Sequence, residues 1–401
     1  MHTTERLYYH DSHLLEFTAR VMDVAELAPG RFGVKLDRTA FYPTGGGQPT
    51  DTGLLANARV VECIDQADEG VLHVVEGSPP VVGAEVAGRV DWARRLDHIQ
   101  QHTGQHILSQ ALVSLFNAPT RAFRMLAHVA EIDVELAEPS LERIEQAVDH
   151  ANHIIWADRP IQIHNVTPAE AARLPLRKDS ARAGELRIIE IKDFDMSPCG
   201  GTHARATGEV GLIAVRAWER AKGMTRLEFV AGQRALADYR RANDAARQVA
   251  ALFSAARDEA LAAVARLLAE HKELTRRIRT LEEHTARYEA EELLANAMLV
   301  NGTRLVAHTF DNRAADALKR LALALIAHPP TVALLGSRDG DDARLVFARS
   351  PDAPGDMNAL MRAACTLLGG RGGGRADMAQ GGGRNTAQLA EALATAVRSL
   401  T

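Results

Sequence analysis

Two pairs of potential metal ligands, far apart in the chain, constrain the fold of this sequence more than any other feature. His102 and His106 lie four residues apart, a spacing that on a helix places both imidazoles on one face. Cys199 and His203 repeat this interval across the glycine pair 200–201, which suits a tight turn. If the fold brings the two pairs together, they form a set of three nitrogens and one sulfur, as in a tetrahedral zinc site.

Each pair has a simpler explanation when it is taken alone. Histidines four apart are common on helices, and a single cysteine is often an inert buried thiol. The run 198–203 favours the metal interpretation, because its residue types contribute little to packing a core. His98, one turn before His102, is a further potential ligand, although four better donors already complete a tetrahedral shell. Thr103 stands where the HExxH metalloproteases carry a glutamate general base, so a protease of that kind is disfavoured.

Composition describes an ordinary soluble, multidomain protein. The chain has 401 residues, of which 46% are hydrophobic and 25% charged, with a net charge of −5. This charge argues against a uniformly basic nucleic-acid surface, so any RNA binding must come from local patches. Three scattered cysteines, Cys63, Cys199 and Cys365, do not form a disulfide framework, which indicates a reducing cytoplasm. No signal sequence or apolar membrane-spanning run is present, and no membrane association is expected.

Residues 1–95 predict a small β-barrel-like domain, because short strands alternate with glycine and proline. A glycine-rich run, 41–53, interrupts it and contains Gly45, Gly46 and Gly47 followed by Gln48. Consecutive glycines lose much entropy on ordering, so an ordered run indicates that the backbone approaches something closely. The alternative is a flexible hairpin tip. The expected strands are 16–23, 32–36, 59–65, 71–75 and 85–90.

Residues 96–235 predict an α+β domain that carries both ligand pairs. Apolar residues recur every three or four positions from residue 91 onward, which predicts a helix with His102 and His106 on one side. The alternation at 128–134, within 120–136, predicts a strand. The remaining expected elements are a helix at 140–156, strands at 160–166 and 185–191, and alternating residues at 210–232.

Residues 236–297 predict a helical spacer with a heptad repeat. Leu267, Leu274, Leu281 and Tyr288 are seven apart, and Val264, His271, Ile278 and Thr285 form a second series three positions earlier. A dimeric coiled coil and a long helix packed on its own chain as a hairpin remain equally good interpretations.

Residues 298–401 predict an α/β domain with strands at 303–307, 331–336 and 345–348 and helices at 314–327 and 357–368. Its glycine run, 369–383, predicts a phosphate-binding loop. Backbone N–H groups of Gly372, Gly373 and Gly374 would form an anion nest, with charge from Arg371 and Arg375. A disordered linker is the alternative, although a linker rarely carries a core such as 375–380.

The amino-acid sequences of these motifs resemble those of a known family. DHIQQHTGQHILSQAL and SPCGGTHARATGEVG are similar to the editing domain of alanyl-tRNA synthetases and of the free-standing AlaX proteins, and the C-terminal glycine run resembles the last domain of those synthetases. The resemblance implies one zinc ion at His102, His106, Cys199 and His203. It also implies that the 45–47 glycine motif lies near the zinc pocket. The Asp-His-His motif of the related phosphoesterases is absent, so nuclease activity is disfavoured.

The resemblance covers nearly the whole chain and implies a long-form AlaX protein, a hydrolase of tRNA for alanine that wrongly carries serine or glycine. Thr103, Thr120 and Gln48 are the candidates for contacting the serine hydroxyl. A homodimer through the spacer or the last domain is a further expectation. Two alternatives remain: a tRNA-binding module in which zinc is purely structural, and a threonyl-type editing hydrolase or a hydrolase of free amino-acid esters.

Overall fold

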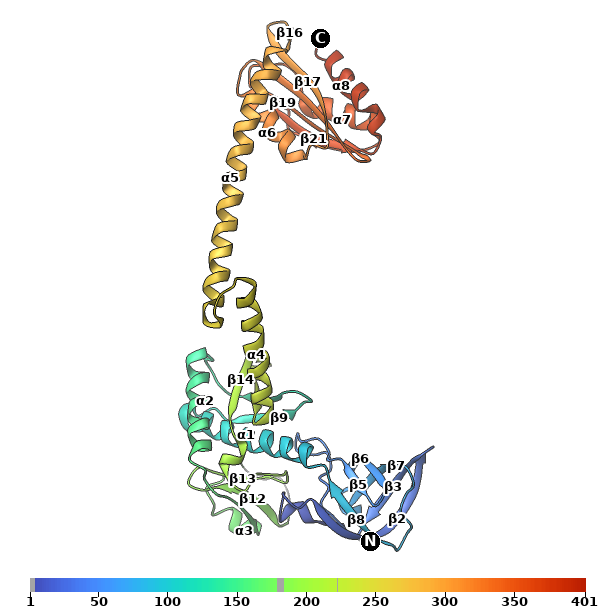
Figure 1. The fold of residues 1–401 in the computed structure, drawn as a ribbon, viewed down its shortest axis with the longest axis vertical. Coiled ribbons are helices and arrows are strands. Elements are labelled where there is room, and N and C mark those ends of the chain that lie inside the picture. Colours follow the sequence, from blue (N-terminus) through green and yellow to red (C-terminus); the bar gives the residue numbers. More distant parts are fainter. Residues whose placement is uncertain (1–3, 179–183, 222) are drawn as a thin grey trace. The chain divides into compact units, whose positions relative to one another are not determined.

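The computed structural model describes residues 4–178, 184–221 and 223–401, which separate into two compact units, Met1–Gln248 and Val249–Thr401 (Figure 1). Both units combine helices with strands, so the predicted α+β multidomain class is confirmed at this level. Within these described ranges, no helix is at once long and apolar enough to cross a lipid bilayer. The four-domain division stays a prediction.

A closed six-stranded barrel begins the first unit, as the sequence predicts. Alternate side chains point inward, as in β8, where every second residue is buried. Strand β5 is only three residues long, too short for alternation to reveal it in the sequence. The strands in order around the barrel are β2 (Glu16–Ala28), β3 (Arg31–Leu36), β7 (Val71–Glu76), β6 (Ala58–Asp65), β5 (Gly53–Leu55) and β8 (Glu85–Val90). Strands β1 (Glu5–Arg6) and β4 (Arg38–Thr39) pair beside it.

Helix α1 (Trp92–Phe116) follows the barrel and carries the first ligand pair. The Asp91 side chain accepts hydrogen bonds from the first-turn backbone and begins the helix, and Asn117, at φ 50°, ends it. Most of the middle of α1 is buried, because it contacts the barrel on one side and the next hydrophobic core on another.

Arg95 ties α1 to the barrel, and its side chain is completely buried. Its guanidinium donates to the carbonyl oxygens of Ser12 and Ala40 at 2.6 Å each, and to the carboxylate of Asp51 at 2.5 Å. The Ser12 hydroxyl in turn accepts a hydrogen bond from the backbone N–H of His203 at 3.1 Å. A single side chain on α1 therefore organises the N-terminal segment, the glycine-rich loop and, through Ser12, the second ligand motif.

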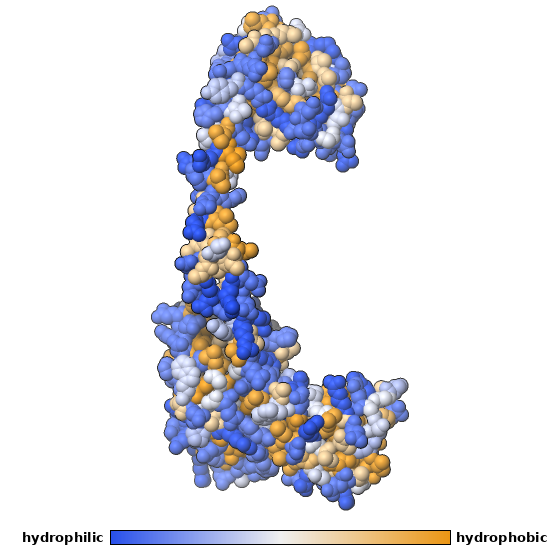
Figure 2. All heavy atoms as spheres, in the orientation of Figure 1, coloured by the Kyte–Doolittle hydropathy of each residue, from blue (hydrophilic) through white to orange (hydrophobic). Residues whose placement is uncertain are grey.

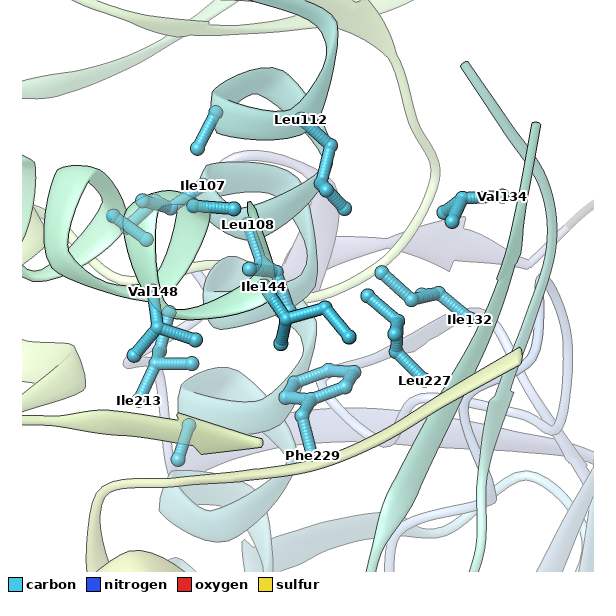
Figure 3. Packing of buried hydrophobic residues seen from close by; sticks show 14 of the residues in the cluster. Ile107, Leu108, Leu112, Ile132, Val134, Ile144, Val148, Ile213, Leu227 and Phe229 are labelled. Atoms are coloured by element: carbon cyan, nitrogen blue, oxygen red, sulfur yellow. The ribbon is translucent and has the colours of Figure 1, made fainter. Parts of the chain in front are cut away.

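Two sheets and two longer helices complete the first unit. Figure 3 shows Ile107 and Leu108 of α1 and Ile144 of α2 packing against Ile132 and Phe229 of one sheet. The segment predicted as one strand near 128–134 is part of a hairpin, because β9 pairs with β10. The first sheet runs β14 (Ile213–Ala221), β15 (Met224–Ala231), β10 (Ala130–Val134) and β9 (Thr120–Met125), and the second runs β11 (Ile161–Val166), β12 (Leu186–Ile191) and β13 (Asp195–Pro198). The helices are α2 (Leu141–Trp156), α3 (Pro168–Ala171) and α4 (Gln233–Leu252).

The second unit is a six-stranded sheet with helices on both faces, which agrees with the α/β prediction. Helix α6 and the end of α5 cover one face, and α7 and α8 cover the other. The strands run in the order β16 (Met298–Val300), β17 (Thr303–Asp311), β18 (Thr331–Asp339), β19 (Asp342–Arg349), β21 (Met378–Gly383) and β20 (Arg371–Gly374). The helices are α5 (Ala260–Ala295), α6 (Ala315–Ile326), α7 (Met357–Leu367) and α8 (Leu389–Arg398).

The C-terminal glycine run forms a pair of strands and not the predicted loop, while its binding of phosphate stays a prediction. Gly373 lies opposite Gln380 in the antiparallel pair β20–β21. A Cβ atom on Gly372 or Gly381 would lie 2.7 or 2.5 Å from the sulfur of Cys365 on α7. These two glycines therefore allow a helix to pack directly against the sheet backbone. Arg371 and Arg375 remain exposed at the edge strand.

One face of α5 is apolar and exposed. The heptad residues Leu274 and Leu281 are 56% and 65% exposed, and Figure 2 shows apolar side chains along this part of the helix. Within the second unit these side chains are open to solvent, and the hairpin alternative stays a prediction. The coiled coil stays a prediction.

Candidate metal centre

The four side chains of the two ligand pairs meet at one point in the first unit. One donor atom from each of His102, His106, Cys199 and His203 lies within 4.8 Å of the other three. The Cys199 sulfur lies 3.4 Å from Nε2 of His102 and 3.3 Å from Nε2 of His203. Zinc–ligand distances of about 2.3 and 2.0 Å place tetrahedral donors about 3.5 Å apart, so this donor set fits a zinc ion in chemistry and spacing.

Local structure explains the convergence. Helix α1 stacks the first pair on adjacent turns, with ring centroids 5.5 Å apart. The second pair lies directly after β13, where the chain leaves the sheet through the glycine pair 200–201. A Cβ atom on Gly201 would lie 2.1 Å from Cε1 of His102. Only glycine at this position allows the turn to come so close to the imidazole.

Each histidine is oriented through its other ring nitrogen. With Nδ1 engaged by an oxygen atom, Nε2 is the nitrogen that faces the common point. Because glutamine and aspartate oxygens only accept, two of these Nδ1 atoms carry the proton. The three contacts are His102 Nδ1 to Gln48 Oε1 at 2.7 Å, His106 Nδ1 to Asp195 Oδ2 at 3.2 Å, and His203 Nδ1 to Thr103 Oγ1 at 3.3 Å.

The protonation states of Cys199 and His203 suit a metal cation, whereas, despite the burial of His106, its hydrogen bonds to Asp195 and Cys199 raise its pKa. Burial alone would raise the pKa of the Cys199 thiol, but the neighbouring imidazoles of His102 and His203 outweigh it and hold this pKa well below its ordinary value. Burial lowers the pKa of His203 to about 3, so its imidazole is neutral at pH 7. Thiolate and neutral imidazole are the forms of these side chains that bind metal ions.

Asp195 and Arg177 support the cluster through contacts to His106, and neither was predicted from the sequence as a site residue. Burial would raise the pKa of the Asp195 carboxyl, but the hydrogen bond from His106 and the charge of Arg177 lower this pKa to about 2. Nε of Arg177 donates to Asp195 at 2.7 Å. A carboxylate four residues before a potential metal-ligand cysteine is a signal that the sequence contained, but only the fold shows that it contacts His106.

A cavity of about 490 Å³ lies beside the four donors, a size typical of small-molecule sites. His102, His106 and Cys199 form part of its wall. Gln105 and Arg187, which the sequence analysis also missed, line it together with Thr120. The further lining residues are Tyr9, Gly46, Arg121, Ala122, Phe123, Arg177, Lys178, Glu185, Leu186, Pro198 and Gly200.

The three predicted specificity residues have different positions. Thr120 lines the cavity, and its hydroxyl donates to the Ser109 hydroxyl at 2.6 Å. Gln48 and Thr103 are not among the cavity-lining residues and instead contact His102 and His203. Gln48 also donates to the Thr202 hydroxyl at 2.9 Å, so it connects the two ligand motifs.

The glycine motif lies next to the cluster, where the resemblance implied it. Gly46 lines the cavity, and Gly45 pairs with Gln48 in a short bridge. Gly47 adopts φ +84°, and a Cβ atom there would lie 2.5 Å from the backbone oxygen of Phe123. The loop is therefore ordered against β9 and is not a free hairpin tip.

His98 is not part of the donor cluster. Its Nδ1 lies 3.9 Å from Oδ1 of Asp51, on the barrel side of α1. Burial lowers the pKa of His98 to about 4. We interpret it as a neutral histidine packed between α1 and the barrel.

Comparison with known proteins identifies the family of the chain. The family model described as threonyl and alanyl tRNA synthetase second additional domain matches residues 186–228, and the DHHA1 domain model matches residues 302–401. The alanyl-tRNA editing protein AlaX-L of Pyrococcus horikoshii is 32% identical over 94% of this chain and 94% of its own length. The chain therefore belongs to the AlaX-L family of alanyl-tRNA editing proteins.

The same sequence also matches part of larger enzymes. The alanine–tRNA ligase of Pyrobaculum neutrophilum is 33% identical over 94% of this chain, but the chain spans only 42% of that ligase. The solved C-Ala domain of Aquifex aeolicus alanyl-tRNA synthetase is 30% identical, covers 26% of this chain and 96% of its own, and has a TM-score of 0.24.

Proposed function

We propose that this chain is an aminoacyl-tRNA deacylase, which hydrolyses the ester bond of tRNA for alanine when it carries serine. Glycine-charged tRNA for alanine is the second candidate substrate. The proposed cofactor is one zinc ion per chain, held by His102, His106, Cys199 and His203. Such a substrate would place the protein in the cytoplasm.

The observation that carries the proposal is the convergence of the four donors on the wall of a cavity. They lie within 4.8 Å of one another, and three of them face a space of about 490 Å³. A zinc that only stapled the fold would need no adjoining cavity. The AlaX-L relative, which the chain matches over nearly its whole length, is named as an alanyl-tRNA editing protein.

Bound zinc would supply Lewis-acid chemistry, polarising the ester carbonyl or a water molecule, if it accepted a fifth ligand or released one of its four. The four protein donors already complete a tetrahedral shell, so the residues around the cavity have to position the ester and the attacking water. Gln48, Asp195 and Thr103 contribute by fixing the imidazole rings. Asp195 itself is held by His106 and Arg177 and is too acidic to act as a general base.

Discrimination between serine and alanine depends on one hydroxyl group. Ser109 accepts hydrogen bonds from both Thr120 and Gln105, at 2.6 and 2.8 Å. The remaining lone pairs on the Thr120 hydroxyl and the Gln105 carbonyl oxygen are acceptors at or near the cavity wall. A serine hydroxyl can donate to such an acceptor and alanine cannot, which gives stronger discrimination than an apolar pocket provides.

The second unit supplies the proposed contacts outside the cavity. Arg371 and Arg375 are exposed at the edge strand β20 and would bind tRNA phosphates as side chains rather than through a glycine nest. The exposed heptad face of α5 would pair with the same face of a second copy of the chain.

The deciding experiment measures deacylation of serine-charged and alanine-charged tRNA for alanine by the wild type and by Cys199→Ala, with bound zinc quantified in both. We expect rapid loss of serine but not alanine, and loss of activity together with the metal in the variant. Cys63→Ala is the matched control, because Cys63 is a buried thiol in the barrel core.

The other outcomes separate the alternatives. A zinc-loaded wild type that hydrolyses neither ester would indicate a tRNA-binding module with a structural metal. Hydrolysis of serine-charged tRNA for threonine in preference to serine-charged tRNA for alanine would indicate a threonyl-type editor. Activity on free seryl esters that is unaffected by charge-reversal of Arg371 and Arg375 would indicate a hydrolase that does not need the tRNA.

A further inference from the structure

Arg187, on β12, is a buried cation that holds the turn between the second pair of ligands. The residue is 9% exposed. Its Nε donates to the carbonyl oxygen of Tyr9 at 2.9 Å, and its Nη1 donates to the carbonyl oxygens of Cys199 and Gly201 at 2.8 and 2.9 Å. The guanidinium therefore hydrogen-bonds to the backbone on both sides of Gly200.

In the described part of the chain, the charge of Arg187 is balanced mainly by the Cys199 thiolate and not by a carboxylate. Among the described residues, no carboxylate forms an ion pair with it, and its Nη2 has no hydrogen-bond partner. The neighbouring cavity arginines differ, since Arg177 pairs with Asp195 and Arg121 pairs with Glu135. Burial lowers the pKa of Arg187, and among its neighbours the Cys199 thiolate opposes this most strongly.

A buried cation without a carboxylate partner is an expensive way to stabilise a fold. Its three bonds all go to backbone carbonyl groups, and two of these belong to the turn that presents Cys199. This turn contains consecutive glycines, which are the residues with most conformational freedom to lose. Contacts from outside the turn have to restrict its backbone before Cys199 can bind a metal ion. The hydrogen bonds of Arg187 to the carbonyl oxygens of Cys199 and Gly201 provide this restriction.

We propose that Arg187 is a positioning residue of the metal centre, which fixes the Cys199–Gly201 turn so that the thiolate is already in place when the ion binds. The inference rests on the metal site of the proposed function. It assigns the role to the planar fork of the guanidinium, which can reach three carbonyl oxygens at once, and not to positive charge alone.

The test compares Arg187→Lys and Arg187→Gln with the wild type in a competition titration of zinc against a chromophoric chelator. Lysine keeps the charge but cannot bridge the three carbonyl groups. Both variants are expected to raise the zinc dissociation constant by about tenfold or more, the range found for groups that support metal ligands. Arg121→Gln is the matched control, because it removes a cavity cation that does not touch the turn, and its zinc affinity should stay unchanged.

Unfolding temperatures with and without zinc distinguish positioning from general stabilisation. If Arg187 positions the turn, the metal-free proteins should unfold at similar temperatures, and the increase on adding zinc should be smaller in both variants. Wild-type zinc affinity in Arg187→Lys would overturn the proposal, as would an equal loss in Arg121→Gln or a loss of stability that is the same with and without metal. If Arg187→Gln does not fold, Arg187→Lys alone decides.

These measurements use no tRNA. A chain that binds zinc more weakly in the Arg187 variants but hydrolyses no ester would support the inference and refute only the proposed deacylase activity. A wild type that binds no zinc would refute both.

Discussion

The Oε1 atom of Gln48 lies 2.7 Å from Nδ1 of His102, so the glycine-rich loop of the barrel orients the first potential metal ligand of α1. The same side chain reaches Thr202 between the two ligands of the second motif. Gln48 is therefore placed to align both halves of the donor set, although it is distant from them in sequence.

Gln48→Ala is expected to weaken zinc binding. Without the Gln48 oxygen, the His102 ring loses the contact that fixes its orientation and tautomer, and loss of such a contact raises metal dissociation constants by about 10- to 100-fold. A zinc competition titration measures the change. Gln105→Ala, a cavity glutamine that contacts Ser109 and no ligand, should bind zinc like the wild type. Equal affinity in the Gln48 variant would contradict the proposed role.

Thr120→Val should reduce the preference for serine. The variant keeps the shape of the side chain but removes the hydroxyl, so kcat/KM for the serine ester should fall by about tenfold or more. Thr120→Ser restores the hydroxyl and should recover most of the activity. Both esters are measured by the release of labelled amino acid. Unchanged selectivity in Thr120→Val would refute a contact between Thr120 and the serine hydroxyl and would leave Gln105 as the candidate for that contact.

Gly201→Ala should destroy the donor geometry. The new methyl group would lie 2.1 Å from Cε1 of the His102 ring, so the ring or the turn has to move. Overpacking of this kind destabilises a protein by about 1–3 kcal/mol, and here it should also abolish zinc binding. In Gly45→Ala, the added atom would lie 3.6 Å from the Tyr42 hydroxyl, an ordinary contact. Zinc content after dialysis should distinguish the two variants, and retention of metal by Gly201→Ala would show that the turn is more adaptable than its contacts indicate.

The barrel should lose stability in mild acid because of His73. Burial lowers the pKa of His73 from 6.5 to about 4. Below pH 6.5, His73 becomes protonated in the unfolded chain but stays neutral in the folded protein. The free energy of unfolding therefore decreases as the pH falls toward 4. Over this pH range, the lowered pKa of His73 reduces the free energy of unfolding by about 3 kcal/mol.

His73→Gln removes this titration and should flatten the pH dependence of urea unfolding between pH 6.5 and 4. His98 and His203 also have lowered pKa values and act in the same direction, so the slope should decrease without disappearing. An unchanged slope would show that His73 becomes protonated in the folded protein.

Association through α5 should depend on its exposed leucines. Leu274→Asp combined with Leu281→Asp places charges on the heptad face and should convert a dimer into a monomer, as measured by sedimentation equilibrium. Lys272→Asp alters the charge on a different face of the same helix and should leave the dimer intact. A monomeric wild type would refute the coiled coil.

Sequence spacing grouped the four donor residues because helix periodicity and a glycine turn are local rules, and these side chains do lie together in the fold. The supporting contacts could not be predicted in this way. Asp195 reaches His106 from β13, and Arg187 reaches the Cys199 turn from β12, so both depend on how a sheet packs against α1. Long-range pairing of this kind leaves no periodic signal in one sequence.

Glycine runs were ambiguous for a related physical reason. A missing Cβ indicates that the backbone closely approaches another group, but it does not identify that group. At Gly47 the close neighbour is the backbone of β9, beside the donor cluster, whereas at Gly372 and Gly381 it is Cys365 of a packed helix. The same composition therefore marks a functional loop in one unit and a helix–sheet contact in the other.

Helix α1 combines in one rigid element the anchor Arg95, the donors His102 and His106, and the core residue Ile107. Each residue added to an α-helix turns everything beyond it by about 100°. A single insertion between Arg95 and His102 would thus rotate both imidazoles away from Cys199, or else break the hydrogen bonds between the Arg95 guanidinium and the barrel. The chain can vary freely in the length of its surface loops, but along these few turns its evolution is restricted to exchanging one side chain for another.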